Sequence, residues 1–92
     1  NSFGGFMEII YSNQALEDLK YWKKSGNKSI QKKITSLISA ILENPTEGIG
    51  SPEPLKHNLS GFYSRRINQE HRLIYRITES VIRIETLKGH YK

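Results

Sequence analysis

The stretch "FYSRRINQEHRLIYRITESVIRIETL", residues 62–87, holds three runs rich in β-branched and aromatic residues, which two short polar connections separate. The runs cover residues 62–67, 71–77 and 81–87, and the connections read "NQE" and "TES". Runs of this composition are typical of strands, and connections this short are typical of antiparallel hairpins. The stretch therefore predicts a three-stranded antiparallel meander.

Side chains should alternate across this meander, because successive residues of a strand point to opposite faces. We expect helices to cover one face and leave open a face that carries several arginines. Such a face suits phosphate, because the planar guanidinium fork matches phosphate oxygens. The predicted face-sharing sets are Ser64 with Arg66, opposite Tyr63, Arg65 and Ile67; Arg72, Ile74 and Arg76, opposite Leu73, Tyr75 and Ile77; and Ile82, Ile84, Thr86 and Lys88, opposite Val81, Arg83 and Glu85.

The residues before the meander predict one strand and two helices. "MEIIYS", residues 7–12, is a short β-favouring run, and Ser12 or Asn13 can cap the helix that follows. Gly26 and Asn27 separate this helix from a second one, which Pro45 ends. Both helices are predicted from apolar residues at helical spacing: Ala15, Leu16, Leu19 and Trp22 in the first, and Ile30, Ile34, Leu37, Ile38, Ile41 and Leu42 in the second.

The predicted order is β-α-α-β-β-β, an α+β fold in which two helices pack on one face of an antiparallel sheet. The first strand must join that sheet to bury its isoleucines. The chain of 92 residues suits one small domain, residues 7–92. We expect residues 1–6, "NSFGGF", to be an expression scar or a disordered arm.

Composition narrows the class of function. The chain has no cysteine, no apolar run of membrane length and no recognisable signal peptide, which favours the cytoplasm and no membrane contact. The formal net charge of +5 favours nucleic acid, an anionic surface or an acidic protein as partner. The alternative is a soluble domain that is basic without binding any of them.

One acid and one histidine are candidates for proton transfer. Glu53 lies between Pro52 and Pro54, which stiffen the backbone around it, so it is a candidate general base. The alternative for Glu53 is an ordinary solvated loop glutamate. His90 is a candidate general acid, the alternative being a histidine on a frayed tail, and His57 and His71 are further candidates. No spacing resembles a metal motif, so no cofactor is expected.

A basic cluster accompanies these two residues. Its functional interpretation is phosphate binding and stabilisation of transition-state charge, and the alternative is solubilising charge on strand faces. Tyrosines can stack on bases, whereas Phe62 and Trp22 are interpreted as core residues. The candidate cations are Lys56, Arg65, Arg66, Arg72 and Arg76, and the candidate stacking residues are Tyr63, Tyr75 and Tyr91.

An acid, a histidine and a cationic cluster are the groups needed to cleave RNA without a metal. A base takes the proton of a ribose 2′-hydroxyl, which attacks the neighbouring phosphorus. A cation stabilises the phosphorane charge, and an acid protonates the leaving 5′-oxygen. Each proton-transfer group typically contributes roughly 10²–10⁴-fold to such a reaction.

The segment "PEPLKHNLSGFYSRRINQEHRLIYRI", residues 52–77, together with the closing "HY", resembles the Txe/YoeB toxins of the RelE/ParE superfamily. The resemblance covers residues 7–91 and implies a RelE-like microbial RNase fold. It also implies a type II toxin that cleaves mRNA in the ribosomal A site without a metal. The expected products carry a 2′,3′-cyclic phosphate or 3′-phosphate and a 5′-hydroxyl.

The resemblance also assigns roles to residues and names partners. It implies that Glu53 is the base, that Arg72 lies at the scissile phosphate and that His90 is the acid. Lys56 and Arg66 match supporting cations, and Tyr91 would orient the RNA. The implied partners are a YefM-like acidic antitoxin and a second copy of the chain in a homodimer. Gly89 departs from the family pattern, which usually has an aromatic or bulkier residue there.

Two other functions stay open from the sequence. A related branch of the superfamily poisons DNA gyrase by protein binding, but that branch lacks the set of Glu53, Arg72 and His90. A non-catalytic RNA-binding module would need only the basic charge and exposed tyrosines.

Overall fold

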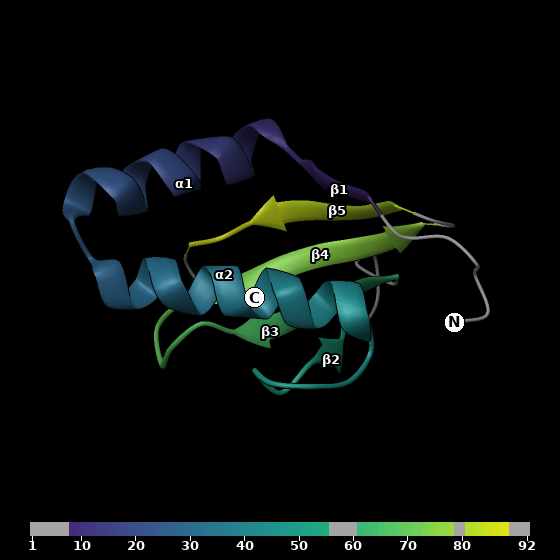
Figure 1. Ribbon diagram of the computed structural model, residues 1–92. Helices are drawn as coiled ribbons and strands as arrows, with labels where there is room; N and C mark the ends of the chain where they lie inside the picture. Colours follow the sequence, from purple (N-terminus) through teal and green to yellow (C-terminus); the bar gives the residue numbers. More distant parts are fainter. Residues whose placement is uncertain (1–7, 56–60, 79–80, 89–92) are drawn as a thin grey trace.

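The computed structural model describes residues 8–55, 61–78 and 81–88. Two helices cover one face of a five-stranded sheet with the strand order β1-β5-β4-β3-β2 (Figure 1). This arrangement confirms the predicted α+β class, and neither helix of the described residues lies on the other face of the sheet. The elements are β1 (Glu8–Tyr11), α1 (Asn13–Ser25), α2 (Lys28–Glu43), β2 (Glu53–Pro54), β3 (Phe62–Arg66), β4 (Arg72–Thr78) and β5 (Val81–Thr86).

Polar caps define where the two helices begin and end. The Ser12 hydroxyl accepts a hydrogen bond from the Ala15 N–H at the start of α1, and Gly26 ends α1 in the left-handed conformation at φ 72°. A left-handed residue at this position favours glycine, which has no Cβ to clash. The Asn27 side chain then accepts from the Ile30 N–H and starts α2. Neither described helix is long and apolar enough to cross a membrane.

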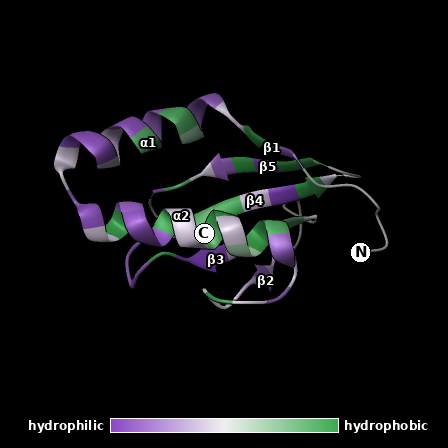
Figure 2. Ribbon diagram, viewed as in Figure 1, coloured by the Kyte–Doolittle hydropathy of each residue, from purple (hydrophilic) through white to green (hydrophobic). Residues whose placement is uncertain are grey.

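The core lies between the helices and the covered face of the sheet. Hydrophobic and hydrophilic residues recur along both helices (Figure 2), as expected for elements with one buried side. Trp22 is buried, as predicted. The buried cluster consists of Ala15, Trp22, Ile30, Ile34, Leu37, Ile41, Ile67, Leu73, Tyr75, Ile82, Ile84 and Leu87.

The pairing of β1 differs from the predicted antiparallel sheet. β1 joins the sheet as expected, but it runs parallel to β5, so the sheet is mixed. Hydrogen bonds at the turn into α1 continue this parallel pairing. Ser12 follows β1 directly, and it donates its N–H to the Ile84 carbonyl and its hydroxyl to the Glu85 carbonyl. The start of α1 is therefore tied to the end of β5.

Two irregularities in the sheet were not predicted. The segment 45–54, predicted as a loop, contains the short strand β2, which pairs with β3. In addition, β5 carries a bulge, because Ile74 pairs with Thr86 whereas Tyr75 pairs with Ile84. The prediction that Thr86 shares a face with Ile84 is therefore wrong. The extra residue shifts Thr86 to the uncovered face and lets Leu87 enter the core.

Candidate functional site

Glu53 and Arg72 meet on the uncovered face of the sheet. Oε1 of Glu53 lies 3.5 Å from Nη1 of Arg72, and the two side chains are 65% and 27% exposed. A surface ion pair of this kind contributes little to stability. Because both side chains are partly exposed, a bound molecule can reach them. Strand pairing restrains the backbone of each residue.

Strand register explains how the two side chains reach each other. Ser64 lies directly opposite Glu53 on one side and opposite Ile74 on the other. Arg72 is two residues before Ile74 on β4, so its guanidinium reaches diagonally across Ser64, whose Oγ lies 3.4 Å from Nη1. Ser64 is fully buried and forms the floor of the site. The sequence analysis gave it no role, and only its face-sharing with Arg66 pointed to the site.

Further arginines extend the positive charge along this face. Arg66 is exposed and lies directly opposite Arg72, and Arg76 lies directly opposite Arg83. Arginines paired in this way repel each other unless an anion lies between them. Arg83 was missing from the predicted cationic set, although its predicted alternation with Ile82 and Ile84 placed it away from the core.

Arg65 does not belong to this cationic face, contrary to the prediction. It is fully buried on the helix side of the sheet, and four acceptors surround its guanidinium. Nε donates to the Tyr75 hydroxyl at 3.1 Å, Nη1 to the Ile49 carbonyl at 3.1 Å, and Nη2 to the carbonyls of Asn44 at 2.6 Å and Glu47 at 2.9 Å. Its donors thus hold the segment that leads into β2 and Glu53.

Two aromatic residues, Tyr75 and Phe62, do not have the roles that the sequence predicted for them. Tyr75 is fully buried rather than available to bases, and burial raises the pKa of its hydroxyl despite the lowering effect of the Arg65 hydrogen bond. Tyr63 is half-buried, and its ring stacks on that of Tyr75. Phe62, predicted in the core, is half-buried beneath the Arg76 guanidinium, whose Cζ lies 5.2 Å from the ring centroid.

Several predicted site residues lie outside the described residues. These are Lys56, His57, Gly89, His90 and Tyr91. His71 is described, and its ring packs edge-on against Trp22 with the ring centroids 4.8 Å apart. The grouping of Glu53 with Arg72 is therefore the part of the predicted catalytic set that the structure brings together.

Side chains of α1 hold the backbone of Leu87, which lies three residues before His90 in the sequence. The buried Asp18 carboxylate accepts the Leu87 N–H at 2.9 Å through Oδ2, and its Oδ1 accepts from Gln14. Nε1 of Trp22 donates to the Leu87 carbonyl, also at 2.9 Å. Both backbone polar groups of Leu87 are thus satisfied by side chains of α1. No sequence signal identified Asp18 for this role.

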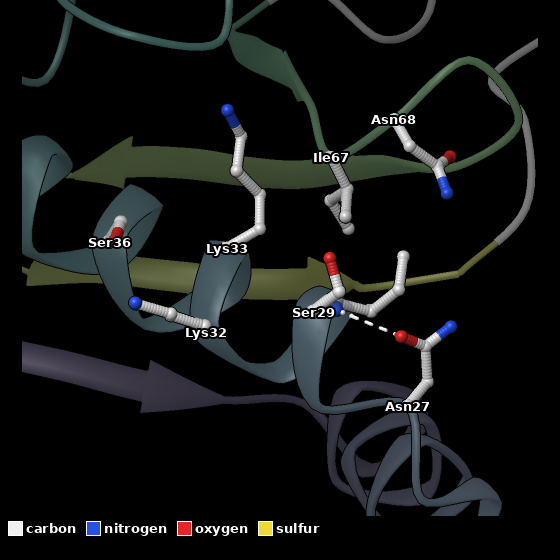
Figure 3. Close-up of a pocket in the computed structure, with 8 residues that line it drawn as sticks. Asn27, Ser29, Lys32, Lys33, Ser36, Ile67 and Asn68 are labelled. Carbon is white, nitrogen blue, oxygen red and sulfur yellow. Dashed lines mark hydrogen bonds between the residues drawn. The ribbon is translucent and has the colours of Figure 1, made fainter.

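A groove elsewhere on the surface is separate from this site. It has a volume of about 550 Å³ and lies along the first half of α2 (Figure 3). None of the predicted site residues lines it. The lining residues are Asn27, Ser29, Ile30, Lys32, Lys33, Ser36, Ile67 and Asn68.

The arrangement on the open face can perform one kind of chemistry well. A carboxylate and a guanidinium converge on one accessible spot, which allows proton abstraction beside a stabilised anion. In the part of the chain that the structure describes, no group of three or more histidines and carboxylates could hold a metal ion.

Comparisons with known proteins identify the family. A family model described as YoeB-like toxin of bacterial type II toxin-antitoxin system matches residues 11–91. The chain is 48% identical to toxin YoeB of Escherichia coli strain K12 over 85 residues, which are 92% of this chain and 100% of that protein.

Solved structures agree with this match. The YoeB dimer of Staphylococcus aureus superposes with a TM-score of 0.84 at 49% identity, over 92% of this chain and 98% of that one. The YoeB–YefM complex of the same species gives 0.83 at 50% identity with the same coverage. The fold is thus the RelE-like fold that the sequence resemblance implied. The chain belongs to the YoeB family of toxins of bacterial type II toxin–antitoxin systems.

Proposed function

We propose that this toxin is an endoribonuclease that cleaves mRNA in the A site of translating ribosomes and thereby inhibits translation. The observation that carries the proposal is the 3.5 Å approach of Glu53 to Arg72 on an accessible, arginine-rich sheet face. Family membership and the net charge of +5 support a polyanionic substrate. Because the proposed substrate is mRNA under translation, the toxin would act in the cytoplasm.

In the proposed mechanism, Glu53 takes the proton of a ribose 2′-hydroxyl. The resulting oxygen attacks the adjacent phosphorus, and the Arg72 guanidinium stabilises the charge that builds up on the phosphorane. His90 donates a proton to the leaving 5′-oxygen. Positioning supplies a large part of the acceleration. The restraint of Glu53 on β2 and of Arg72 on β4 supports this assignment, because both aim at one spot from paired strands.

The remaining cations would hold the RNA backbone. Arg66 lies beside Arg72 and is exposed, so it can bind a phosphate next to the reacting one. Lys56, Arg76 and Tyr91 are assigned to the same binding surface from the sequence. Arg65 is left out, because its donors are already used inside the protein.

No metal takes part in the proposed reaction. The products would then carry a 2′,3′-cyclic phosphate, or the 3′-phosphate formed by its hydrolysis, and a 5′-hydroxyl. A 5′-hydroxyl end can be labelled by polynucleotide kinase without prior phosphatase treatment. Cleavage that leaves a 5′-phosphate would contradict the mechanism.

The proposed partners follow from the relatives. The structures from Staphylococcus aureus show a YoeB dimer and complexes of YoeB with YefM. We propose that this chain likewise forms a homodimer and is neutralised by an acidic, YefM-like antitoxin. The arginines of the open face would attract an anionic segment that folds on binding.

The test is primer extension on mRNA after incubation with translating ribosomes. Wild-type toxin should produce new 5′ ends at codons that occupy the A site, and Glu53→Gln should remove them while ribosome binding persists. Ribosome binding without any cut by the wild type would favour a non-catalytic RNA-binding module. Intact mRNA together with trapped gyrase–DNA complexes would favour the gyrase-poisoning alternative.

A further inference from the structure

A second row of side chains crosses the open face beyond the Glu53 site. Phe62 on β3 lies opposite Arg76 on β4, which in turn lies opposite Arg83 on β5. Phe62 is two residues from Ser64 along β3, so the row lies roughly 7 Å from the floor of the site at the usual strand rise. The row therefore continues the same surface away from the reacting groups.

Carboxylates of the described residues neutralise the positive charge of this row only in part. Arg76 and Arg83 are directly opposed, which is unfavourable for two like charges. Nε of Arg83 contacts Oε2 of Glu85 at 3.0 Å, so one of the two cations has a carboxylate partner. Within residues 8–55, 61–78 and 81–88, Arg76 has no such partner. An anion bound between the two arginines would relieve this repulsion.

Arg76 also has an unused donor. Its Nε is buried and has no hydrogen-bond partner among the described residues. A buried donor without a partner is uncommon and calls for an explanation. The guanidinium meanwhile lies over the Phe62 ring. Aromatic rings and guanidinium planes are the surfaces on which the bases of single-stranded RNA stack.

We propose that Phe62, Arg76 and Arg83 form a nucleotide subsite, which holds a phosphate and a neighbouring base of single-stranded mRNA away from the cleaved bond. The inference rests on the proposed function, because it takes mRNA as the substrate. Arg72 and Arg76 are four residues apart on β4, roughly 13 Å at the usual rise. Separate nucleotides of one strand would therefore occupy the two places.

The chemistry of the row favours RNA over an acidic peptide. A peptide carboxylate would satisfy the arginines but would make no use of the aromatic ring beside them. A nucleotide supplies both a phosphate for the guanidinium forks and a base for the stacked platform. The half-buried position of Phe62 also limits the side-chain entropy that binding would remove.

The test measures RNA binding without cleavage. The probe is a short fluorescent 2′-O-methyl oligoribonucleotide, which lacks the attacking hydroxyl, titrated with full-length toxin at several salt concentrations. The variants are Phe62→Ala and the double change Arg76→Gln with Arg83→Gln. The matched control removes two positive charges from α2 by Lys32→Gln with Lys33→Gln. Thermal unfolding of each variant checks that the fold is retained.

We expect the double arginine variant to flatten the salt dependence of log K by roughly 0.7, the value for one lost phosphate contact on a single strand. Phe62→Ala should weaken binding roughly tenfold, the size expected for one stacked base. The lysine control should change both quantities little. On ribosomes, the arginine variant should need more toxin for half-maximal cleavage but reach the wild-type rate at saturation.

Three outcomes would overturn the subsite. One is unchanged binding of the probe by the arginine variant. Another is an equal loss in the lysine control, which would show a general effect of net charge. The third is loss of antitoxin binding with RNA binding retained, which would assign the row to the antitoxin. Absence of ribosomal cleavage by the wild type would instead contradict the proposed function, since the probe titration requires no cleavage.

Discussion

The Nε of Arg65 donates a hydrogen bond to the hydroxyl of Tyr75 across 3.1 Å, and both residues are fully buried. The Tyr75 hydroxyl in turn donates to the Pro45 carbonyl at 2.6 Å. Together with the bonds from Arg65 to the carbonyls of Asn44, Glu47 and Ile49, this network ties the segment after α2 to the sheet. That segment leads into β2, so the network helps to position the strand that carries Glu53.

Replacing Arg65 by lysine should therefore destabilise the protein. One ammonium group cannot reach four acceptors placed around a planar fork, and buried carbonyls left without a donor should lower the free energy of unfolding by about 2–3 kcal/mol. Urea denaturation measures this loss. Arg66→Lys is the matched control on the neighbouring, exposed arginine, and it should change stability by less than about 0.5 kcal/mol. Equal effects at the two positions would contradict the role given to Arg65.

The burial of Arg65 shows how sequence reasoning went wrong at this point. Strict alternation separated Arg65 from Arg66 and grouped it with Tyr63 and Ile67, which is where the structure places it. The prediction nevertheless assigned Arg65 to phosphate, because it clusters with the other cations of the same hairpin. An arginine can be buried when its donors are satisfied. The acceptors that satisfy it are backbone carbonyls of residues 44–49, and carbonyl positions leave no trace in the sequence.

Other features were predictable to different degrees. The helices followed from their apolar spacing and caps, and the meander followed from its short connections. The strand β2 was missed because two residues, one of them a proline, show no alternation. The bulge at Glu85 was missed because an extra residue on one strand can be recognised only from the pairing of that strand with its neighbour, here β4. Glu53 and Arg72 were predicted together by family resemblance, whereas Arg83 and Asp18 lacked any such guide.

Stability should fall at high pH because of Tyr75. Its pKa is raised above the ordinary value of 10.0 by burial, so the folded protein retains a proton that the unfolded chain has lost. The contribution is therefore complete below pH 10.0 and disappears as the pH rises through the folded-state pKa. Burial raises the pKa of Tyr11 as well, which adds in the same direction.

Urea denaturation at increasing pH tests this sign. Tyr75→Phe should begin less stable at neutral pH, because it loses the bonds to Arg65 and Pro45. It should then lose stability less steeply above pH 10.0, since only Tyr11 of the two tyrosines with raised pKa values remains. Parallel curves for wild type and variant would show that Tyr75 is not the group responsible.

The bond between Asp18 and the Leu87 N–H should matter for activity as well as stability. Asp18→Ala leaves this buried N–H without an acceptor, which should cost about 1–3 kcal/mol. It also frees the backbone three residues before His90. We expect cleavage to slow by roughly ten- to a hundredfold at a temperature where the variant is folded, because small misplacements of a reacting group have large effects.

Asp18→Asn provides the rescue for this experiment. Its amide oxygen can still accept the Leu87 N–H, so the cleavage rate should return close to that of the wild type. Circular dichroism at the assay temperature confirms folding of both variants. An alanine variant that is less stable but cleaves at the full rate would limit the role of Asp18 to stability.

Arg72→Lys should slow the chemical step while leaving RNA binding almost unchanged. Lysine keeps the charge but lacks the planar fork that can make two hydrogen bonds to phosphate oxygens. Arg72 begins β4 and is paired with Arg66, so its backbone is restrained and its guanidinium reaches across Ser64 toward Glu53. The single ammonium group of a lysine side chain cannot reproduce that geometry. Removal of one such transition-state donor typically lowers the rate by roughly 10²–10³.

Single-turnover cleavage on saturated ribosomes, beside a binding titration at the same salt concentration, measures the two effects separately. Arg72→Gln, which removes the charge as well, serves as the comparison and should weaken both binding and rate. If Arg72→Lys cleaves as fast as the wild type, the residue acts only through its charge. If Arg72→Lys loses binding but keeps its rate at saturation, Arg72 holds the RNA in place and takes no part in the chemical step. We predict normal RNA binding with a slow reaction for Arg72→Lys. This result requires that the guanidinium of Arg72, held on a paired strand, contacts the phosphate during the reaction.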